Sequence, residues 1–259
     1  MSRRKVQQGI QSIEVGARLL EALARAAQPQ MLRDLAAAAD MPPAKAHRYL
    51  VSFARMGLVE QHPESGLYDL GSFALELGLS ALGRLDPVGL AAPMLRDLCQ
   101  ETGQTAALAV WANQGATIVR WLGADTPVAA SLRVGSVMPL TRSATGGAFA
   151  AFLPEEMTSS RVRKELADNA RKGLPPTTPD ELERTLARAR RQGFTHTSEL
   201  IPGISGIAAP VLDHSGAMVL AVIVLGYTKP FEANLDAISA TLLRKAAALS
   251  SRLGWRPAA

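Results

Sequence analysis

The stretch from residue 31 to residue 70 most constrains what this chain can fold into. Residues 31–39 have the apolar spacing of a short helix, and residues 40–43 (Asp-Met-Pro-Pro) predict a tight turn. A second helix follows, and residues 64–66 (Glu-Ser-Gly) predict the turn of a β-hairpin. This order of elements predicts a winged helix-turn-helix, a motif that can place its second helix in the major groove of DNA.

The second helix of this motif has two distinct faces. Its apolar residues recur at the spacing of one buried stripe: Ala46, Tyr49, Leu50 and Phe53. Its polar residues form an adjacent stripe, and the candidate DNA-contacting residues are Lys45, His47, Arg48 and Ser52. Arg48 is the first candidate because a guanidinium can bind a guanine edge or a phosphate. The alternative is that Lys45 and Arg48 are ordinary solvated charges. His47 either faces DNA or packs on its own domain.

The charge of the chain permits an anionic partner without requiring one. The formal net charge is +5, with 28 basic and 23 acidic residues. Arg3, Arg4 and Lys5 form a basic N-terminal arm that could add phosphate contacts. Residues 1–70 nevertheless hold nine Lys and Arg against seven Asp and Glu. Binding to phosphates would therefore need the positive charge to gather on one face.

The cellular compartment follows from what the sequence lacks. Cys99 is the single cysteine, so no intramolecular disulfide can form and a reducing compartment is expected. No apolar N-terminal stretch resembles a signal peptide. The most apolar run, residues 218–225, is far shorter than the ~20 residues of a membrane-spanning helix. The expectation is a cytoplasmic protein with no membrane partner.

Residues 71–85 are unusually apolar for a connecting helix. The large apolar residues are Phe73, Leu75, Leu77, Leu79, Leu82 and Leu85. A lone helix in water would not tolerate so much exposed apolar surface. Two interpretations remain open: the segment is buried against its own domain, or it is a linker helix that packs on another subunit.

From residue 87 the pattern changes to mixed helices and strands, which predicts an α+β domain with an antiparallel sheet and helices outside. Expected strands include residues 105–112, 117–122, 129–133, 207–212 and 217–225. Expected helices include residues 87–102, 144–152, 154–170, 179–192 and 231–253. A turn at residues 213–216 (Asp-His-Ser-Gly) would join the last two strands. On the last strand, Val219, Ala221, Ile223 and Leu225 are expected to share one face.

Catalysis, a metal and a cofactor have little support in the sequence. Cys99 has no histidine near it in the sequence, and a buried structural cysteine is the more common case. The histidines are scattered and lack the spacing of a zinc site: His47, His62, His196 and His214. Residues 203–206 (Gly-Ile-Ser-Gly) match neither a phosphate-binding loop nor a dinucleotide fingerprint. We therefore expect no catalytic residue, no metal and no cofactor.

Nearly the whole chain resembles the IclR family of bacterial transcriptional regulators. The resemblance rests on an ordered series of motifs at residues 46–50, 57–59, 68–71, 134–135, 139–140, 143–148, 190–194 and 203–211, with Asp213 and Gly216. It implies a winged helix-turn-helix domain (residues 1–71), a linker helix (72–86) and a GAF-like effector-binding domain (87–259). It also implies homodimers or homotetramers on double-stranded operator DNA, as repressors or activators. Pro42-Pro43 departs from the Ser or Thr that many members have here.

The candidate effector site is expected where the helix beginning near Ala144 faces residues 203–208. Backbone N–H groups at a helix N-terminus favour a carboxylate, which points to Ala144, Thr145 and Gly146. The resemblance adds lining from His196 or Thr197, and from Gly206, Ile223 and Leu225. The apolar side chains of the last strand, Val219, Ala221, Ile223 and Leu225, favour a small-molecule carboxylate that is aromatic or otherwise hydrophobic. The alternative is that these are ordinary core residues.

Three functional hypotheses remain after the sequence is read. The first is a transcriptional regulator whose operator affinity depends on a carboxylate effector. The second is a small-molecule-processing enzyme with a DNA-binding-like cap. The third is a winged-helix protein that uses its wing and helix for protein contacts alone.

Overall fold

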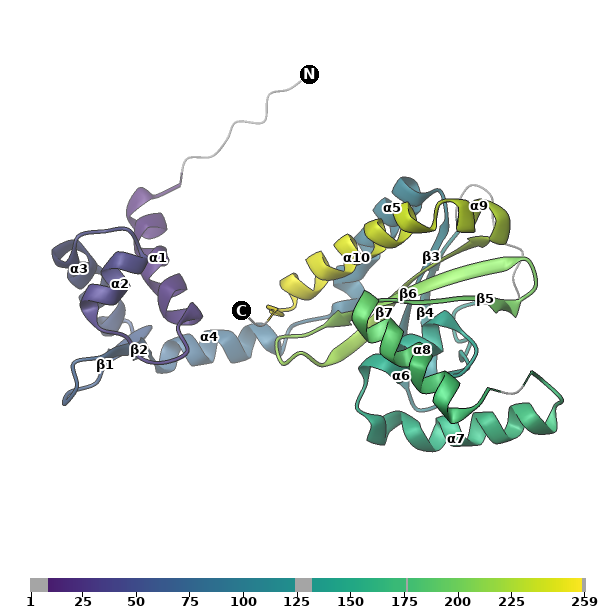
Figure 1. The fold of residues 1–259 in the computed structure, drawn as a ribbon. Helices are drawn as coiled ribbons and strands as arrows, with labels where there is room; N and C mark the ends of the chain where they lie inside the picture. Colours follow the sequence, from purple (N-terminus) through teal and green to yellow (C-terminus); the bar gives the residue numbers. More distant parts are fainter. Residues whose placement is uncertain (1–8, 124–131, 176, 258–259) are drawn as a thin grey trace, which may run out of the picture. The chain divides into compact units, whose positions relative to one another are not determined.

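The computed structural model describes residues 9–123, 132–175 and 177–257, and the chain divides into two compact units at Leu85 and Asp86 (Figure 1). The expected strand at residues 129–133 lies largely outside the described residues.

The first unit is a small helical domain with a two-stranded wing. Its elements are α1 (Gln11–Arg25), α2 (Leu32–Ala38), α3 (Pro43–Arg55), β1 (Val59–Gln61), β2 (Tyr68–Leu70) and α4 (Ser72–Leu82). The apolar faces of α1, α2 and α3 close over one core, in which Leu19, Leu35 and Leu50 are buried completely or nearly so. β1 and β2 pair antiparallel. The turn between them contains Gly66 at φ +71°, a conformation that suits a residue without a Cβ.

The second unit is built on a five-stranded antiparallel sheet. The strands, in spatial order, are β4 (Gly115–Leu122), β3 (Thr105–Ala112), β7 (Met218–Tyr227), β6 (Ile204–Leu212) and β5 (Thr195–Ile201). The expected turn at residues 213–216 joins β6 to β7, where the Asp213 carboxylate accepts hydrogen bonds from the N–H groups of Ser215 and Ala217. The predicted α+β class is confirmed.

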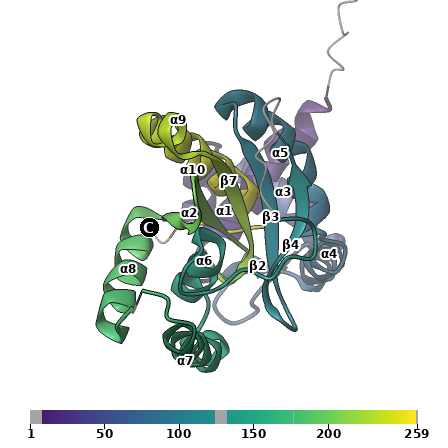
Figure 2. The ribbon, with the colours of Figure 1, turned by 90° about the vertical axis from the view of Figure 1, so that its right-hand side faces the viewer.

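Helices cover both faces of this sheet. One face carries α5 (Pro87–Thr102) and α10 (Leu235–Arg252), and the other carries α6 (Ala144–Phe152), α7 (Glu155–Arg171) and α8 (Pro179–Gln192) (Figures 1 and 2). The core between α5, α10 and the sheet is closely packed, and Leu98, Val222 and Leu242 are completely buried there. The expected single helix at residues 231–253 is two helices, because Asn234 ends α9 (Thr228–Ala233) before α10 begins.

A β-bulge changes the face of one predicted residue. Val211 pairs with Leu220 and Leu212 pairs with Met218, so Val219 is an extra residue between them. Ala221, Ile223 and Leu225 face α6, as expected, whereas Val219 packs with the core under α5 and α10. The expectation that Val219 shares their face is wrong, since one inserted residue reverses the alternation of side chains.

Candidate functional site

The two faces of α3 separate as the sequence predicts. Ala46 and Leu50 are completely buried, whereas Lys45, Arg48 and Ser52 are exposed. Pro42 precedes the helix without a side-chain cap, and Pro43 is its first residue. The hydroxyl of Ser52 donates a hydrogen bond of 3.1 Å to the carbonyl of Arg48, one turn back. The cationic side chains of this face therefore remain available to an external acceptor.

His47 contacts its own domain, as one of the two interpretations of the sequence expects, and it is also exposed. Its side chain is exposed, yet its Nδ1 lies 3.4 Å from the hydroxyl of Tyr68 on β2. This contact joins α3 to the base of the wing. His47 can therefore orient the helix against the wing while its ring edge stays open to solvent.

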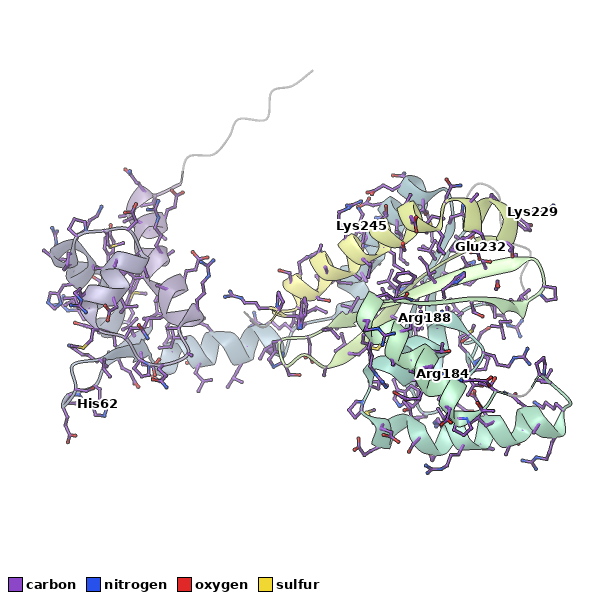
Figure 3. The ribbon with its side chains drawn as sticks, in the orientation of Figure 1. His62, Arg184, Arg188, Lys229, Glu232 and Lys245 are labelled. Carbon is purple, nitrogen blue, oxygen red and sulfur yellow. The ribbon has the colours of Figure 1, made fainter. Side chains whose placement is uncertain are left out.

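The wing itself holds no lysine or arginine. Residues 59–70 contain Glu60, Glu64 and Asp69, and His62 is their one titratable base (Figure 3). Gln61 steadies the turn by donating a 3.0 Å hydrogen bond to the carbonyl of Gly66. Carboxylates repel the phosphates of DNA, so among residues 9–71 the positive charge that could meet DNA lies on α1, α2 and α3.

The second unit contains an apolar cavity between the sheet and α6. Its space free of protein atoms is about 440 Å³, part of which opens to solvent, but the centre of a water-sized sphere can occupy only about 40 Å³ of it, so the cavity is narrow. Its surface is almost wholly apolar. Its walls come from Ala107, Ile118, Trp121, Leu132, Met138, Ser143, Ala144, Thr145, Thr197, Leu200, Ile201, Ile204, Ser205, Gly206, Ile223 and Leu225.

One end of this cavity is the N-terminus of α6. The Ser143 hydroxyl accepts a 2.8 Å hydrogen bond from the Gly146 N–H and so caps the helix. Ala144 and Thr145 are the first two residues of the helix, so their N–H groups have no carbonyl partner within it. These two N–H groups and the helix dipole favour a negative charge at this end.

The loop before α6 is held in place by α7. The Glu165 carboxylate accepts hydrogen bonds from the N–H groups of Leu140 (2.9 Å) and Thr141 (3.0 Å), and a third from the Thr141 hydroxyl (3.2 Å). Asn169 donates a further hydrogen bond of 3.1 Å to the Thr141 hydroxyl. The start of α6 is thus fixed from outside the sheet.

The structure brings together most of the predicted effector residues. Ala144, Thr145, Gly206, Ile223 and Leu225 all line the cavity. Gly146 does not, because it faces the loop: a Cβ added there would lie 2.0 Å from the carbonyl oxygen of Pro139. Its role is to let α6 approach that loop.

His196 lies on the opposite face of the sheet from the cavity. His196 pairs with Ile207 in the sheet, and both point away from α6, whereas the neighbouring Thr197 lines the cavity. The Nε2 of His196 lies 2.8 Å from Glu232 on α9 (Figure 3). Burial raises the pKa of Glu232, but hydrogen bonds from Ser205 and His196 outweigh it and hold that pKa below its usual value.

Several cavity residues were not anticipated from the sequence. Trp121 and Ile118 come from β4, Met138 from the loop after it, and Leu200 from β5. For the residues on β4 and β5, the only sequence signal was the apolar pattern of the strands, which does not distinguish a cavity wall from a filled core.

The remaining candidates for chemistry do not assemble into a site. Among residues 9–123, 132–175 and 177–257, no three His, Cys, Asp or Glu side chains converge as metal ligands would. Burial raises the pKa of the Cys99 thiol, which favours its unreactive protonated form. Within the same residues, every helix is too short or too polar to cross a bilayer.

Both units match family models of one group of regulators. The model described as the IclR helix-turn-helix domain matches residues 12–63, and the model described as bacterial transcriptional regulator IclR C-terminal matches residues 79–252. The glycerol operon regulatory protein of Streptomyces griseus is 33% identical over 227 residues, which cover 86% of each chain. The transcriptional repressor IclR of Escherichia coli is 29% identical over 84% of this chain and 80% of its own.

Solved structures agree with these sequence matches. The crystal structure of Pseudomonas aeruginosa HmgR is similar with a TM-score of 0.89 and 35% identity, over 96% of this chain and all of that one. The comparisons do not support the alternative of a small-molecule-processing enzyme, since these curated relatives are regulators. The chain therefore belongs to the IclR family of bacterial transcriptional regulators, with an N-terminal helix-turn-helix and a C-terminal effector-binding domain.

Proposed function

We propose that this regulator responds to a carboxylic acid with a single aromatic ring, bound in the apolar cavity. The observation that carries the proposal is the pairing of nearly apolar walls with the Ala144 and Thr145 N–H groups at one end. The ring would lie against Ile223 and Leu225, and the carboxylate would accept hydrogen bonds from the start of α6.

The chemistry of the walls argues against a very small hydrophilic acid. Such an acid needs polar partners on several sides, whereas here the polar groups lie chiefly at the α6 end. The narrowness of the cavity argues against a large ligand. A protein of the same fold, an IclR homologue from Microbacterium hydrocarbonoxydans, has been crystallised with 4-hydroxybenzoate; it is 22% identical with a TM-score of 0.55.

On the DNA side, we propose that α3 enters the major groove and that Arg48 and Lys45 make its charged contacts. Both side chains are exposed on the face opposite the core. Ser52 lies on the same face, and His47 would contact DNA from its position beside Tyr68. The basic arm at residues 3–5 would add phosphate contacts, but it lies outside the described residues.

The exposed apolar face of α4 supports a homodimer or homotetramer. No residue of α4 is buried within the described chain, and Leu75 and Leu79 are 65% and 60% exposed. The proposal assigns residues 1–71 to operator binding, 72–86 to subunit contact and 87–259 to effector binding. The helix-turn-helix domains of two subunits would then bind an operator with two half-sites in the cytoplasm, and effector binding would change the spacing between these domains.

A thermal-shift titration tests the effector proposal. Benzoate and 4-hydroxybenzoate should raise the melting temperature in a saturable way, because a ligand of the folded state stabilises it by mass action. Two matched compounds separate the parts of the site: 4-hydroxybenzyl alcohol lacks the carboxylate, and acetate lacks the ring. The proposal fails if only small hydrophilic acids such as acetate or glyoxylate shift the transition. A gel shift on the DNA upstream of its own gene, with and without the acid, then tests the coupling.

A further inference from the structure

A second and much larger hollow lies beside the apolar cavity. We call it the α8 groove; it is lined by Leu140, Thr141, Arg142, Ser143, Gly147, Pro175, Thr177, Glu181, Leu182, Thr185, Leu186, Arg188, Thr195, His196, Thr197 and Ser198. The centre of a water-sized sphere can occupy about 510 Å³ of it, against about 40 Å³ in the cavity. Ser143 and Thr197 line both hollows and form the wall between them.

The α8 groove differs from the cavity in its chemistry. More of its surface is polar than apolar, and threonine and serine residues line it from α8, from β5 and from the loops before α6 and α8. Some of their hydroxyls hold the walls together: Thr195 donates a 2.6 Å hydrogen bond to the carbonyl of Ala144, and Thr185 one of 2.9 Å to the carbonyl of Glu181. The groove is therefore a fixed polar hollow whose size suits a small molecule.

Two arginines that line this groove have no partner among the residues that the structure describes. Arg142 precedes α6 and Arg188 lies on α8, and neither guanidinium has a hydrogen bond or ion pair with any residue that the structure describes. Arg190, on the same helix, is by contrast used twice: it donates to the carbonyl of Ala151 at 2.8 Å and pairs with Glu183 at 2.7 Å. Free cations in a concave site attract anions.

The one carboxylate among the described side chains that line the groove, Glu181, already has hydrogen-bond partners. The Glu181 carboxylate accepts hydrogen bonds of 2.9 Å from both the N–H and the hydroxyl of Thr178, in the capping box at the start of α8. His196 is likewise used, by its contact with Glu232. Among the described side chains that line the groove, the charged groups without a partner are thus the guanidinium groups of Arg142 and Arg188.

We propose that the α8 groove is a second small-molecule site, which binds an oxyanion between Arg142 and Arg188. A guanidinium binds a carboxylate or a phosphate through two parallel hydrogen bonds, and two guanidinium groups suit a ligand with two negative charges. The site differs from the effector cavity, where backbone N–H groups and apolar walls would hold a monoanion. The ligand class is therefore a small dicarboxylate or a phosphorylated metabolite.

Calorimetric titration of the full-length protein tests this site, with inorganic phosphate in one arm and succinate in the other at constant ionic strength. Saturable binding of either anion supports the proposal, and the preferred anion identifies its source as a phosphoryl or a dicarboxylate compound. Arg142→Gln and Arg188→Gln should each weaken binding about tenfold or more, since each removes a charge-assisted contact. Absence of saturable binding for both anions overturns the proposal.

Arg184→Gln is the matched control. Arg184 lies one turn before Arg188 on α8 and is also exposed, but it does not line the groove (Figure 3). The Arg184→Gln substitution removes the same charge from the same helix as Arg188→Gln. Its anion affinity should stay within twofold of wild type, because a general charge effect is small at constant ionic strength. Equal weakening in Arg184→Gln and Arg188→Gln overturns the proposal, because it would mean that the net charge of α8 rather than the groove binds the anion. Melting curves of each variant check that it is folded.

Discussion

The helix-turn-helix and the apolar cavity offer their candidate contacts in opposite ways. In the first unit the candidate contacts are exposed, charged side chains on one helix. The core beneath this helix holds it in place but contributes no candidate contact. In the second unit the candidate contacts are backbone N–H groups and buried apolar side chains drawn from several elements. A side-chain site can be changed without touching the fold, whereas a site made of backbone and core cannot. The experiments below test that difference, from the largest expected effect to the smallest.

The strongest test of a site built from backbone is Gly146→Ala. The added Cβ would lie 2.0 Å from the carbonyl oxygen of Pro139, so α6 or its preceding loop must move. Overpacking of this kind costs roughly 3 kcal/mol of unfolding free energy, measured by urea denaturation. Gly206→Ala is the control, since its Cβ would meet Leu225 at an ordinary 3.5 Å. Equal stability of the two variants would contradict the account of Gly146.

The corresponding test of the side-chain site is Arg48→Ala. Loss of a base or phosphate contact should weaken operator binding by about tenfold to a hundredfold, with the fold unchanged, as measured by fluorescence anisotropy. Arg25→Ala removes the same charge from an exposed position on α1 and should change affinity far less. If both variants lose affinity alike, the first unit binds DNA by its overall charge and not through α3.

Ile223→Ser tests the apolar wall of the cavity. Replacing the isoleucine side chain with the small, polar hydroxymethyl group of serine should weaken binding of 4-hydroxybenzoate about tenfold, because apolar contact with the ring is lost. Val219→Ser is the control. Val219 lies four residues before Ile223 on β7, and the bulge turns its side chain toward the core under α5 and α10, away from the cavity. Calorimetry that shows the larger loss in Val219→Ser would contradict the assignment of faces.

The smallest effect concerns an exposed ion pair in the second unit. Hydrogen bonds from Lys245 and Arg244 lower the pKa of Glu101. Because its folded-state pKa lies below its unfolded value, this carboxylate stabilises the fold above its ordinary titration range, and the effect is lost as pH falls through the folded-state pKa. Glu101→Gln should therefore slightly lower the melting temperature at neutral pH, and the difference should shrink in acid. A difference that persists in acid would show that charge is not its source.

The sequence was sufficient where one helix carries both core residues and the candidate DNA-contacting residues. On α3, a stripe of apolar residues and an adjacent polar stripe determine which side chains face outward, and the structure exposes Lys45 and Arg48 accordingly. Most strands and helices of the second unit were also predicted, apart from the division between α9 and α10. Each of these elements is long enough for its periodicity to be read without knowledge of its neighbours.

The sequence was insufficient where alternation along a strand decides the outcome. His196 and Thr197 are adjacent, so a one-residue choice moves a side chain from the cavity to the opposite face of the sheet. The bulge at Val219 depends on the pairing of β6 with β7, and the break at Asn234 depends on packing around α9, which no local pattern encodes. The unpaired state of Arg142 and Arg188 could be seen only once α8 and the loop before α6 were placed together.

The hydrogen bonds from Leu140 and Thr141 to Glu165 have a consequence for the thermodynamics of binding. A loop whose backbone is already ordered in the folded protein loses little further conformational entropy when a ligand arrives. The α6 end of the cavity, where we propose that the carboxylate binds, is thus preorganised by α7, an element that contributes no residue to the cavity's walls. Ligand affinity can in this way depend on a helix that the ligand never touches.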